Sequence, residues 1–171
     1  MIELGVFILL SLLLVAFTLS RPHRHRFPRV IAAESFLALV LLNARGWFDD
    51  PLSPRQLVSW LFLAASLALA IHGFRLLHTV GAPKEDIENT SRLITVGAYR
   101  YIRHPLYCTL LLGGIGLILK GPSALGFLVL LILIIAVFIT AKVEEQENLE
   151  RFGEEYVAYR KVTKMFIPYL L

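Results

Sequence analysis

Three short segments of the sequence carry residue types that chemistry needs. The first, residues 92–107, reads RLITVGAYRYIRHPLY and places arginines, a histidine and tyrosines directly before a hydrophobic run. Gly97 frees the backbone for a turn, and Pro105 opens a helix without losing a hydrogen bond, because first-turn amides have no acceptor inside the helix. The N-terminus of a helix favours anions. A helix beginning at Pro105 therefore predicts a site for a carboxylate or another anion, flanked by the ring of His104 and the hydroxyl of Tyr107.

A plainer explanation exists for parts of this segment. Arginines mark the cytoplasmic side of membrane proteins, and tyrosines anchor them at the membrane–water interface. That explanation covers each arginine and tyrosine taken singly. It explains neither Gly97 nor the pair His104 and Pro105, so the segment as a whole indicates a site.

The other two segments lie towards the C-terminus. Glu144 and Glu145 stand near the end of a predicted helix, where a carboxylate opposes the helix dipole and where buried charge near a membrane costs free energy. The pair therefore either faces water or holds a cation. Residues 151–168, RFGEEYVAYRKVTKMFIP, have the periodicity of an amphipathic helix that ends before Pro168 and that Gly153 bends or breaks.

The elements that position these segments are hydrophobic. The chain of 171 residues is 57% hydrophobic and has a mean hydropathy of +0.68, whereas soluble domains are roughly 45–50% apolar. A membrane-spanning helix needs roughly 17–25 residues, and only the fourth apolar run is shorter. Its glycines predict a tight hairpin with the fifth run. The runs are about 4–20, 30–47, 56–77, 106–119 and 123–141.

We therefore predict an all-α, polytopic integral membrane protein with about five transmembrane helices and a C-terminal amphipathic cytoplasmic helix. The first run lacks the basic N-terminal region and the small-residue cleavage pattern of a signal peptide, and the basic segment RPHRHRFPR follows it, so we interpret it as a retained membrane helix. Residues 1–74 would hold the first three helices, and residues 75–171 the core with the three segments.

The charges predict the orientation. Most of the 17 basic residues follow the first, third and fifth runs, which places the N-terminus outside and the three segments in the cytoplasm. Because these charges stand at the ends of apolar runs, the net charge of +4 does not indicate a nucleic-acid partner. The single cysteine, Cys108, excludes an internal disulfide and a multi-cysteine metal site. We predict no metal.

Taken in this order, the segments resemble a known family. G-x-Y-x-x-x-R-H-P-x-Y, a helical hairpin, E-E, and F-G-E-E-Y-x-x-Y before a terminal I-P resemble the isoprenylcysteine carboxyl methyltransferases and, more broadly, the integral-membrane phospholipid methyltransferases. The resemblance covers about residues 75–168. It implies that residues 75–171 form a methyltransferase core and that S-adenosylmethionine is the methyl donor. The residues that it implies for cofactor contact are Ser91, Arg92, Leu93, Ile94, Tyr99, His104, Pro105, Leu106, Tyr107 and Glu144.

One position departs from the family pattern. In the isoprenylcysteine enzymes an arginine four residues before the glutamate positions the substrate carboxylate, whereas Thr140 stands there in this chain. Lys142 is close in sequence but lies on a different face of the helix. The resemblance thus implies a retained cofactor half and a changed acceptor half, with Thr140 and Lys142 as the acceptor-binding candidates.

The acceptor implied is a lipophilic or amphiphilic small molecule, with membrane lipid as the other partner. A carboxylate acceptor needs no general base. An amine, phenol or thiol does, and the candidates are His104, Glu145 and Glu34, an acid about one turn inside the second apolar run.

Three alternatives stay open at this stage. The chain could be a phospholipid N-methyltransferase, or an NADPH-dependent membrane reductase, because sterol-reductase-like enzymes have a similar C-terminal helical layout. It could also be a non-catalytic membrane module whose cationic cytoplasmic face contacts anionic lipid.

Overall fold

The computed structural model describes residues 2–19, 26–82 and 90–170. Within these ranges the chain is all-helical and forms no strand, which confirms the predicted class; residues Ile102 and Lys164 pair in an isolated bridge. The elements are α1 (Ile2–Leu19), α2 (Arg26–Leu42), η1 (Ala44–Trp47), α3 (Pro54–Thr79), η2 (Gly97–Arg100), α4 (Pro105–Ile118), α5 (Ala124–Phe152) and α6 (Glu154–Val162).

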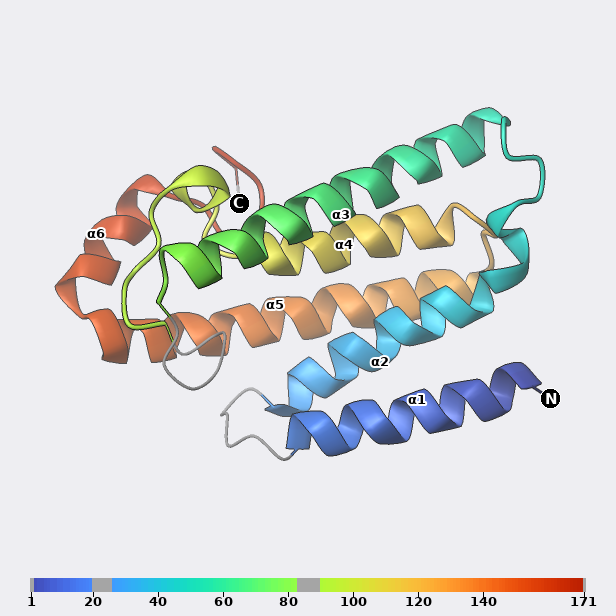
Figure 1. Cartoon of the computed structure of the whole chain (residues 1–171), viewed down its shortest axis with the longest axis horizontal. Coiled ribbons are helices and arrows are strands. Elements are labelled where there is room, and N and C mark those ends of the chain that lie inside the picture. The colour runs from blue at the N-terminus through green and yellow to red at the C-terminus, as the bar shows by residue number, and fades with distance from the viewer. Residues whose placement is uncertain (1, 20–25, 83–89, 171) are drawn as a thin grey trace.

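The first five α-helices lie side by side as a bundle in which successive helices run in opposite directions (Figure 1). The most extensive packing joins α3 to α4 and α2 to α5. The short helix η2 and α6 both lie at the end of the bundle where α5 finishes (Figure 1). The start of α4 and the end of α5 therefore meet at this end.

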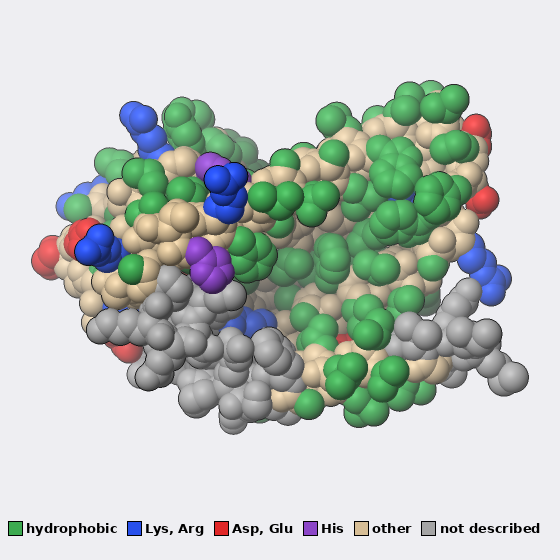
Figure 2. Space-filling model, in the orientation of Figure 1, with side chains coloured by type: hydrophobic (Ala, Val, Ile, Leu, Met, Phe, Trp, Pro, Cys, Tyr) green, Lys and Arg blue, Asp and Glu red, His purple; other side chains and the backbone are tan. Residues whose placement is uncertain are grey.

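Two helices are long and apolar enough to cross a membrane among the residues searched, α3 and α5. The fourth apolar run forms a helix of only 14 residues, Pro105–Ile118, as its length predicts. Hydrophobic side chains cover the middle of the bundle, and most of the charged side chains on the visible face lie near its two ends (Figure 2). This distribution suits a chain embedded in a bilayer. The number of crossings, five from the apolar runs, stays a prediction.

Gly153 divides the predicted C-terminal amphipathic helix. Its φ of 53° is in the left-handed region, and α5 ends at Phe152 while α6 begins at Glu154. The apolar run 123–141 is thus only the first part of a 29-residue helix. The break predicted at Gly153 is confirmed, but the residues before it continue α5 rather than forming a separate surface helix. This extension carries Glu144 and Glu145 on a rigid helix.

Glycines of α4 bring its backbone close to both neighbours. A Cβ at Gly116 would lie 2.8 Å from Cγ of Leu63 on α3, and one at Gly114 would lie 2.8 Å from Cδ2 of Leu133 on α5. The Ser59 hydroxyl also donates to the carbonyl of Gly116 across the α3–α4 contact, at 2.7 Å. The close approach predicted between the fourth and fifth runs therefore extends to α3.

The opposite end of the bundle is held by a buried lysine. Lys120, in the turn between α4 and α5, is 1% exposed and donates to the Gln56 side chain at 2.9 Å. Its ammonium lies 3.3 Å from the ring centroid of Trp60, a cation–π contact. These contacts fix the α4–α5 turn on α3, and with it the register of the hairpin that ends at the candidate site.

Candidate active site

Gly97 makes the turn that leads into η2. Its φ is +60°, and a Cβ there would lie 2.5 Å from Nε2 of His72. That ring nitrogen accepts a hydrogen bond from the amide of Ala98 at 3.2 Å. The turn predicted at Gly97 is confirmed, and both its φ and its close contact require glycine. It positions Tyr99 on η2 at the entrance to the next segment.

The two polar segments meet through their backbones. The amide of Arg103 donates to the carbonyl of Lys164 at 2.8 Å, and the amide of His104 donates to that of Met165 at 3.2 Å. In return, the amide of Lys164 donates to the carbonyl of Tyr101 at 3.1 Å. The residues directly before α4 are thus fixed to the residues directly after α6.

A buried ion pair joins the same elements to α5. Glu145 is 3% exposed, and its carboxylate accepts a hydrogen bond from Nε of Arg103 at 2.6 Å. The guanidinium of Arg103 also donates to the carbonyl of Thr163 at 2.6 Å, and Arg160 lies 3.6 Å from the other Glu145 oxygen. Glu145, a candidate base from the sequence, is therefore engaged in holding three elements together.

Glu144 faces a different direction and meets Tyr107. The Tyr107 hydroxyl donates to Oε2 of Glu144 at 2.6 Å, and the Tyr107 ring stacks on His104 with centroids 5.5 Å apart. His104 is buried between the two glutamates, with Nδ1 3.8 Å from Glu144 and Nε2 3.7 Å from Glu145. These distances exceed those of hydrogen bonds. The buried Nε2 has no hydrogen-bond partner within the described ranges.

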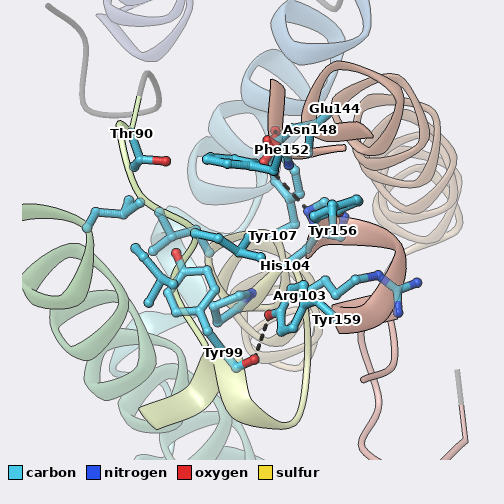
Figure 3. A pocket seen from close by; sticks show the side chains of 15 residues that line it. Thr90, Tyr99, Arg103, His104, Tyr107, Glu144, Asn148, Phe152, Tyr156 and Tyr159 are labelled. Carbon is cyan, nitrogen blue, oxygen red and sulfur yellow. Dashed lines mark hydrogen bonds and ion pairs between the residues drawn. The ribbon is translucent and has the colours of Figure 1, made fainter. Parts of the chain in front are cut away.

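His104, Tyr107 and Glu144 line a cavity of about 110 Å³, and Figure 3 shows the side chains that converge on it. Most of the predicted cofactor residues line it, namely Leu93, Ile94, Tyr99, His104, Pro105, Leu106, Tyr107 and Glu144. Ser91 and Arg92 are exposed and are not among its lining residues, and the Ser91 hydroxyl instead donates to the carbonyl of Ala82. Sites for drug-sized ligands measure roughly 300–1,000 Å³. The enclosed part of the cavity is thus smaller than such a ligand.

Several lining residues were not predicted as site residues. Asn148 is four residues after Glu144 on α5 and faces the same cavity, so helical spacing alone would have indicated it. Tyr156 and Tyr159 of α6 are the tyrosines of the motif F-G-E-E-Y-x-x-Y, but the sequence does not predict them as cofactor contacts. Burial, with a contribution from the Glu145 carboxylate, raises the pKa of Tyr156 to about 12. Its hydroxyl therefore stays protonated at neutral pH and can donate a hydrogen bond. The remaining unpredicted lining residues are Leu77, Thr90, Arg103 and Phe152.

A second cavity, of about 400 Å³, opens behind Tyr107 among α1, α2, α4 and α5. Tyr107 lines both cavities, and Arg29 of α2 lies 3.4 Å from its hydroxyl. Thr140 lines the second cavity, and its hydroxyl donates to the carbonyl of Ala136 on its own helix. The other lining residues are apolar: Leu14, Ala32, Ala33, Phe36, Leu37, Val40 and Leu110. This second cavity, called the apolar chamber below, is thus mostly apolar and has a polar end beside Glu144.

The two remaining predicted residues lie elsewhere. Glu34 of α2 accepts a hydrogen bond from the hydroxyl of Ser11 on α1. It is not among the residues that line either cavity. Lys142 is exposed and lines a separate groove with other basic residues. No group of His, Cys, Asp and Glu side chains among the described residues is arranged to hold a metal ion.

Fold and site together define a helical membrane protein with a polar, ring-lined cavity at one end of its bundle, next to an apolar chamber. The sequence model of the phospholipid methyltransferase family matches residues 54–155, from the start of α3 into α6. The chain therefore belongs to the phospholipid methyltransferase family, a family of membrane methyltransferases. The resemblance to integral-membrane phospholipid methyltransferases is confirmed. No curated protein and no solved structure matches the chain.

Proposed function

We propose that the protein transfers a methyl group from S-adenosylmethionine to a lipophilic or amphiphilic acceptor. The observation that carries the proposal is the hydrogen bond between Tyr107 and Glu144. It stands in the wall where the polar, ring-lined cavity adjoins the apolar chamber. A charged methyl donor in the polar cavity and a lipophilic acceptor in the apolar chamber would meet at this wall.

The chemistry of the polar cavity fits the donor. Glu144 suits an ammonium group or ribose hydroxyls, and the first-turn amides of α4 suit a carboxylate. The rings of Tyr99, Tyr156 and Phe152 suit an adenine or a sulfonium cation. The unpartnered Nε2 of His104 is a further polar atom that a ligand can satisfy. The lining therefore offers complementary groups for the carboxylate, the sulfonium and either the ammonium or the ribose of S-adenosylmethionine.

When bound, S-adenosylmethionine supplies an electrophilic methyl group. Glu144, held by Tyr107, would orient the donor, and the buried surroundings would exclude water from the reacting atoms. Of the three candidate bases, only His104 lines the cavity, while Glu145 is engaged with Arg103 and Glu34 faces α1. For an acceptor that must lose a proton, we propose His104 as the base.

The second cavity is the proposed acceptor site. Its apolar walls suit a hydrocarbon chain, and Arg29 adds a cation at the end nearest Glu144. Thr140 stands where the isoprenylcysteine enzymes have their arginine, and it lines this same cavity. We propose that Arg29, from another helix, binds the anionic head of the acceptor in its place. The acceptor class would then be an amphiphile with a carboxylate or phosphate beside the methylated atom.

Replacing Arg29 with Leu tests the acceptor class. A hydrogen bond to a charged group contributes about 1.5–3 kcal/mol, so KM for an anionic acceptor is expected to rise roughly 10- to 100-fold. KM for an acceptor with the same chain but no anionic group should stay close to that of the wild type. Steady-state kinetics with a long-chain amine that carries a carboxylate beside the nitrogen, and with the same amine lacking that carboxylate, measure both, with Arg75→Leu on α3 as the control. Equal losses for both acceptors would show that Arg29 acts only through packing.

The orientation also belongs to this proposal. Five crossings would place the N-terminus outside and the active site in the cytoplasm, with residues 1–74 and 75–171 as the two parts of the chain. Supporting it, α1 begins at the end of the bundle opposite α6 (Figure 1). An Asp50→Cys variant should then react with an impermeant thiol reagent added outside intact cells. If the cysteine is protected in intact cells and reacts in inverted membranes, the orientation is the opposite of the one proposed.

Binding and transfer of the methyl donor test the activity directly. Calorimetry on detergent-purified protein should show saturable binding of S-adenosylmethionine and S-adenosylhomocysteine and none of NADPH. Labelled methyl groups should then appear in lipids extracted from the membrane. Binding of NADPH alone would favour the reductase, and binding of neither nucleotide by folded protein would favour a non-catalytic module.

A further inference from the structure

A groove of about 530 Å³ beside the candidate active site is lined by an unusual number of cations. It lies among α5, α6 and the segment that follows α6. Arg103 lines both the groove and the candidate active site. The cationic lining residues are Arg103, Lys142, Arg160, Lys161 and Lys164.

The charges in this groove are not balanced within it. Arg103 and Arg160 share the Glu145 carboxylate, at 2.6 and 3.6 Å. Lys142, Lys161 and Lys164 are exposed, and no carboxylate partner for them is found in the described part of the chain. Clustered charges of one sign in a recess concentrate the field and attract a counter-ion. The groove therefore favours an anion.

The backbone that carries these cations is fixed. Lys164 exchanges backbone hydrogen bonds with Tyr101 and Arg103, at 3.1 and 2.8 Å. Before it, the Thr163 hydroxyl donates to the carbonyl of Tyr159 at 2.6 Å, and the Thr163 carbonyl accepts from the Arg103 guanidinium. The backbone of the groove is thus preformed, which lowers the conformational entropy that the protein loses when an anion binds.

A lipid-facing apolar stripe of α5 runs into the groove. Leu131, Ile135, Phe138 and Lys142 follow at helical spacing, and the three apolar side chains are 52, 50 and 42% exposed. The Lys142 ammonium lies 5.5 Å from the ring centroid of Phe138. The cationic groove therefore lies at the end of an exposed apolar stripe that suits a hydrocarbon chain. An occupant with an anionic head and an apolar tail would match both at once.

We propose that this groove binds the phosphate of an anionic phospholipid, whose acyl chain lies along the exposed stripe of α5. The site is separate from the acceptor chamber that Thr140 and Arg29 line, so this lipid is bound and not methylated. It does not depend on the proposed methyl transfer. Because Arg103 lines both sites, the bound head group would stand next to the ion pair that shapes the candidate active site.

The test compares lipid binding by the full chain in neutral detergent. The ligands are phosphatidylglycerol, phosphatidylcholine of the same chain length, and inorganic phosphate, and native mass spectrometry counts the retained lipids. The variant is Lys142→Gln with Lys161→Gln and Lys164→Gln. The control is Arg75→Gln with Arg100→Gln and Arg151→Gln, which removes the same charge from exposed positions outside the groove. Circular dichroism checks that both variants are folded.

We expect wild type to bind phosphatidylglycerol more tightly than phosphatidylcholine. The groove variant should bind phosphatidylglycerol about 100-fold more weakly, because each of the three lysines contributes roughly a fivefold gain in affinity for an anionic lipid. The control variant should keep most of the wild-type affinity. Equal affinity for the two lipids, or equal losses in both variants, would overturn the proposal. Lysine-dependent binding of inorganic phosphate with no preference for the lipid would overturn it too, in favour of a soluble phosphate ligand.

Discussion

Replacing Glu144 with Gln is expected to weaken binding of S-adenosylmethionine by about 100-fold or more. The change keeps the shape of the side chain but removes the negative charge in the lining that Tyr107 orients. A charged hydrogen bond contributes about 1.5–3 kcal/mol, and the loss of long-range attraction to the sulfonium and ammonium groups adds to it. Calorimetric titration with S-adenosylmethionine measures the affinity, and transfer of a labelled methyl group measures kcat/KM.

The matched control is Glu150→Gln, six residues further along the same helix at an exposed position. It removes the same charge from the same end of the protein and should leave affinity within about twofold of wild type, because exposed charges are screened. If both variants lose affinity equally, the net charge of this end of the molecule attracts the donor and Glu144 does not contact it. Such an outcome would remove the main support for the cofactor assignment.

Tyr107→Phe separates orientation from charge. The Phe variant retains the ring that stacks on His104 but cannot donate to Glu144. Affinity should fall less than in Glu144→Gln, by roughly tenfold, as for one net hydrogen bond. In the double variant the two losses should not add, because both act on one carboxylate. Additive losses would show that the two side chains contribute to binding independently.

That Tyr107 and Glu144 lie at the same end of the bundle could be predicted from the sequence. Two apolar runs joined by a short turn form an antiparallel hairpin, and α4 rises about 20 Å over its 14 residues. A similar rise along α5 brings the helix back to the level of Pro105 near Phe138, and Glu144 lies six residues, or about 9 Å, beyond that level. The local motif therefore fixes which ends meet, and the family match over residues 54–155 agrees with it.

Other features of the site could not be predicted because distant segments create them. Arg29 is 78 positions from Tyr107 in sequence, and only the packing of α2 on α5 brings it to the second cavity. Glu144 and Glu145 point in different directions because neighbouring residues of a helix are about 100° apart, but which of them meets Arg103 depends on where distant segments pack. Ser91 and Arg92, in contrast, are predicted site residues that the structure places outside the cavity lining. They are neighbours of lining residues in the sequence. Their side chains are nevertheless exposed to solvent, because the chain there forms no regular helix.

Replacing Arg103 with Met is expected to destabilise the protein by about 3–5 kcal/mol, the usual cost of leaving a buried charge without its partner. Glu145 is only 3% exposed, so water cannot replace the guanidinium. Arg160, at 3.6 Å and largely solvent-facing, compensates only in part. The carbonyl of Thr163 would also lose its donor. Denaturant unfolding in a mild detergent, followed by circular dichroism, measures the change, with Arg100→Met at an exposed position as the control.

The double variant Arg103→Met with Glu145→Met tests why the single variant Arg103→Met loses stability. If the single variant is unstable because Glu145 is left charged and buried, removing both charges should restore most of the lost stability, since apolar groups often replace a buried ion pair at little cost. If the double variant is as unstable as the single one, the hydrogen bond from Arg103 to Thr163 is the larger contribution. A single variant as stable as wild type would mean that water reaches Glu145. Because Arg103 also lines the candidate active site, donor binding by the refolded double variant would then report whether the ion pair serves only the fold.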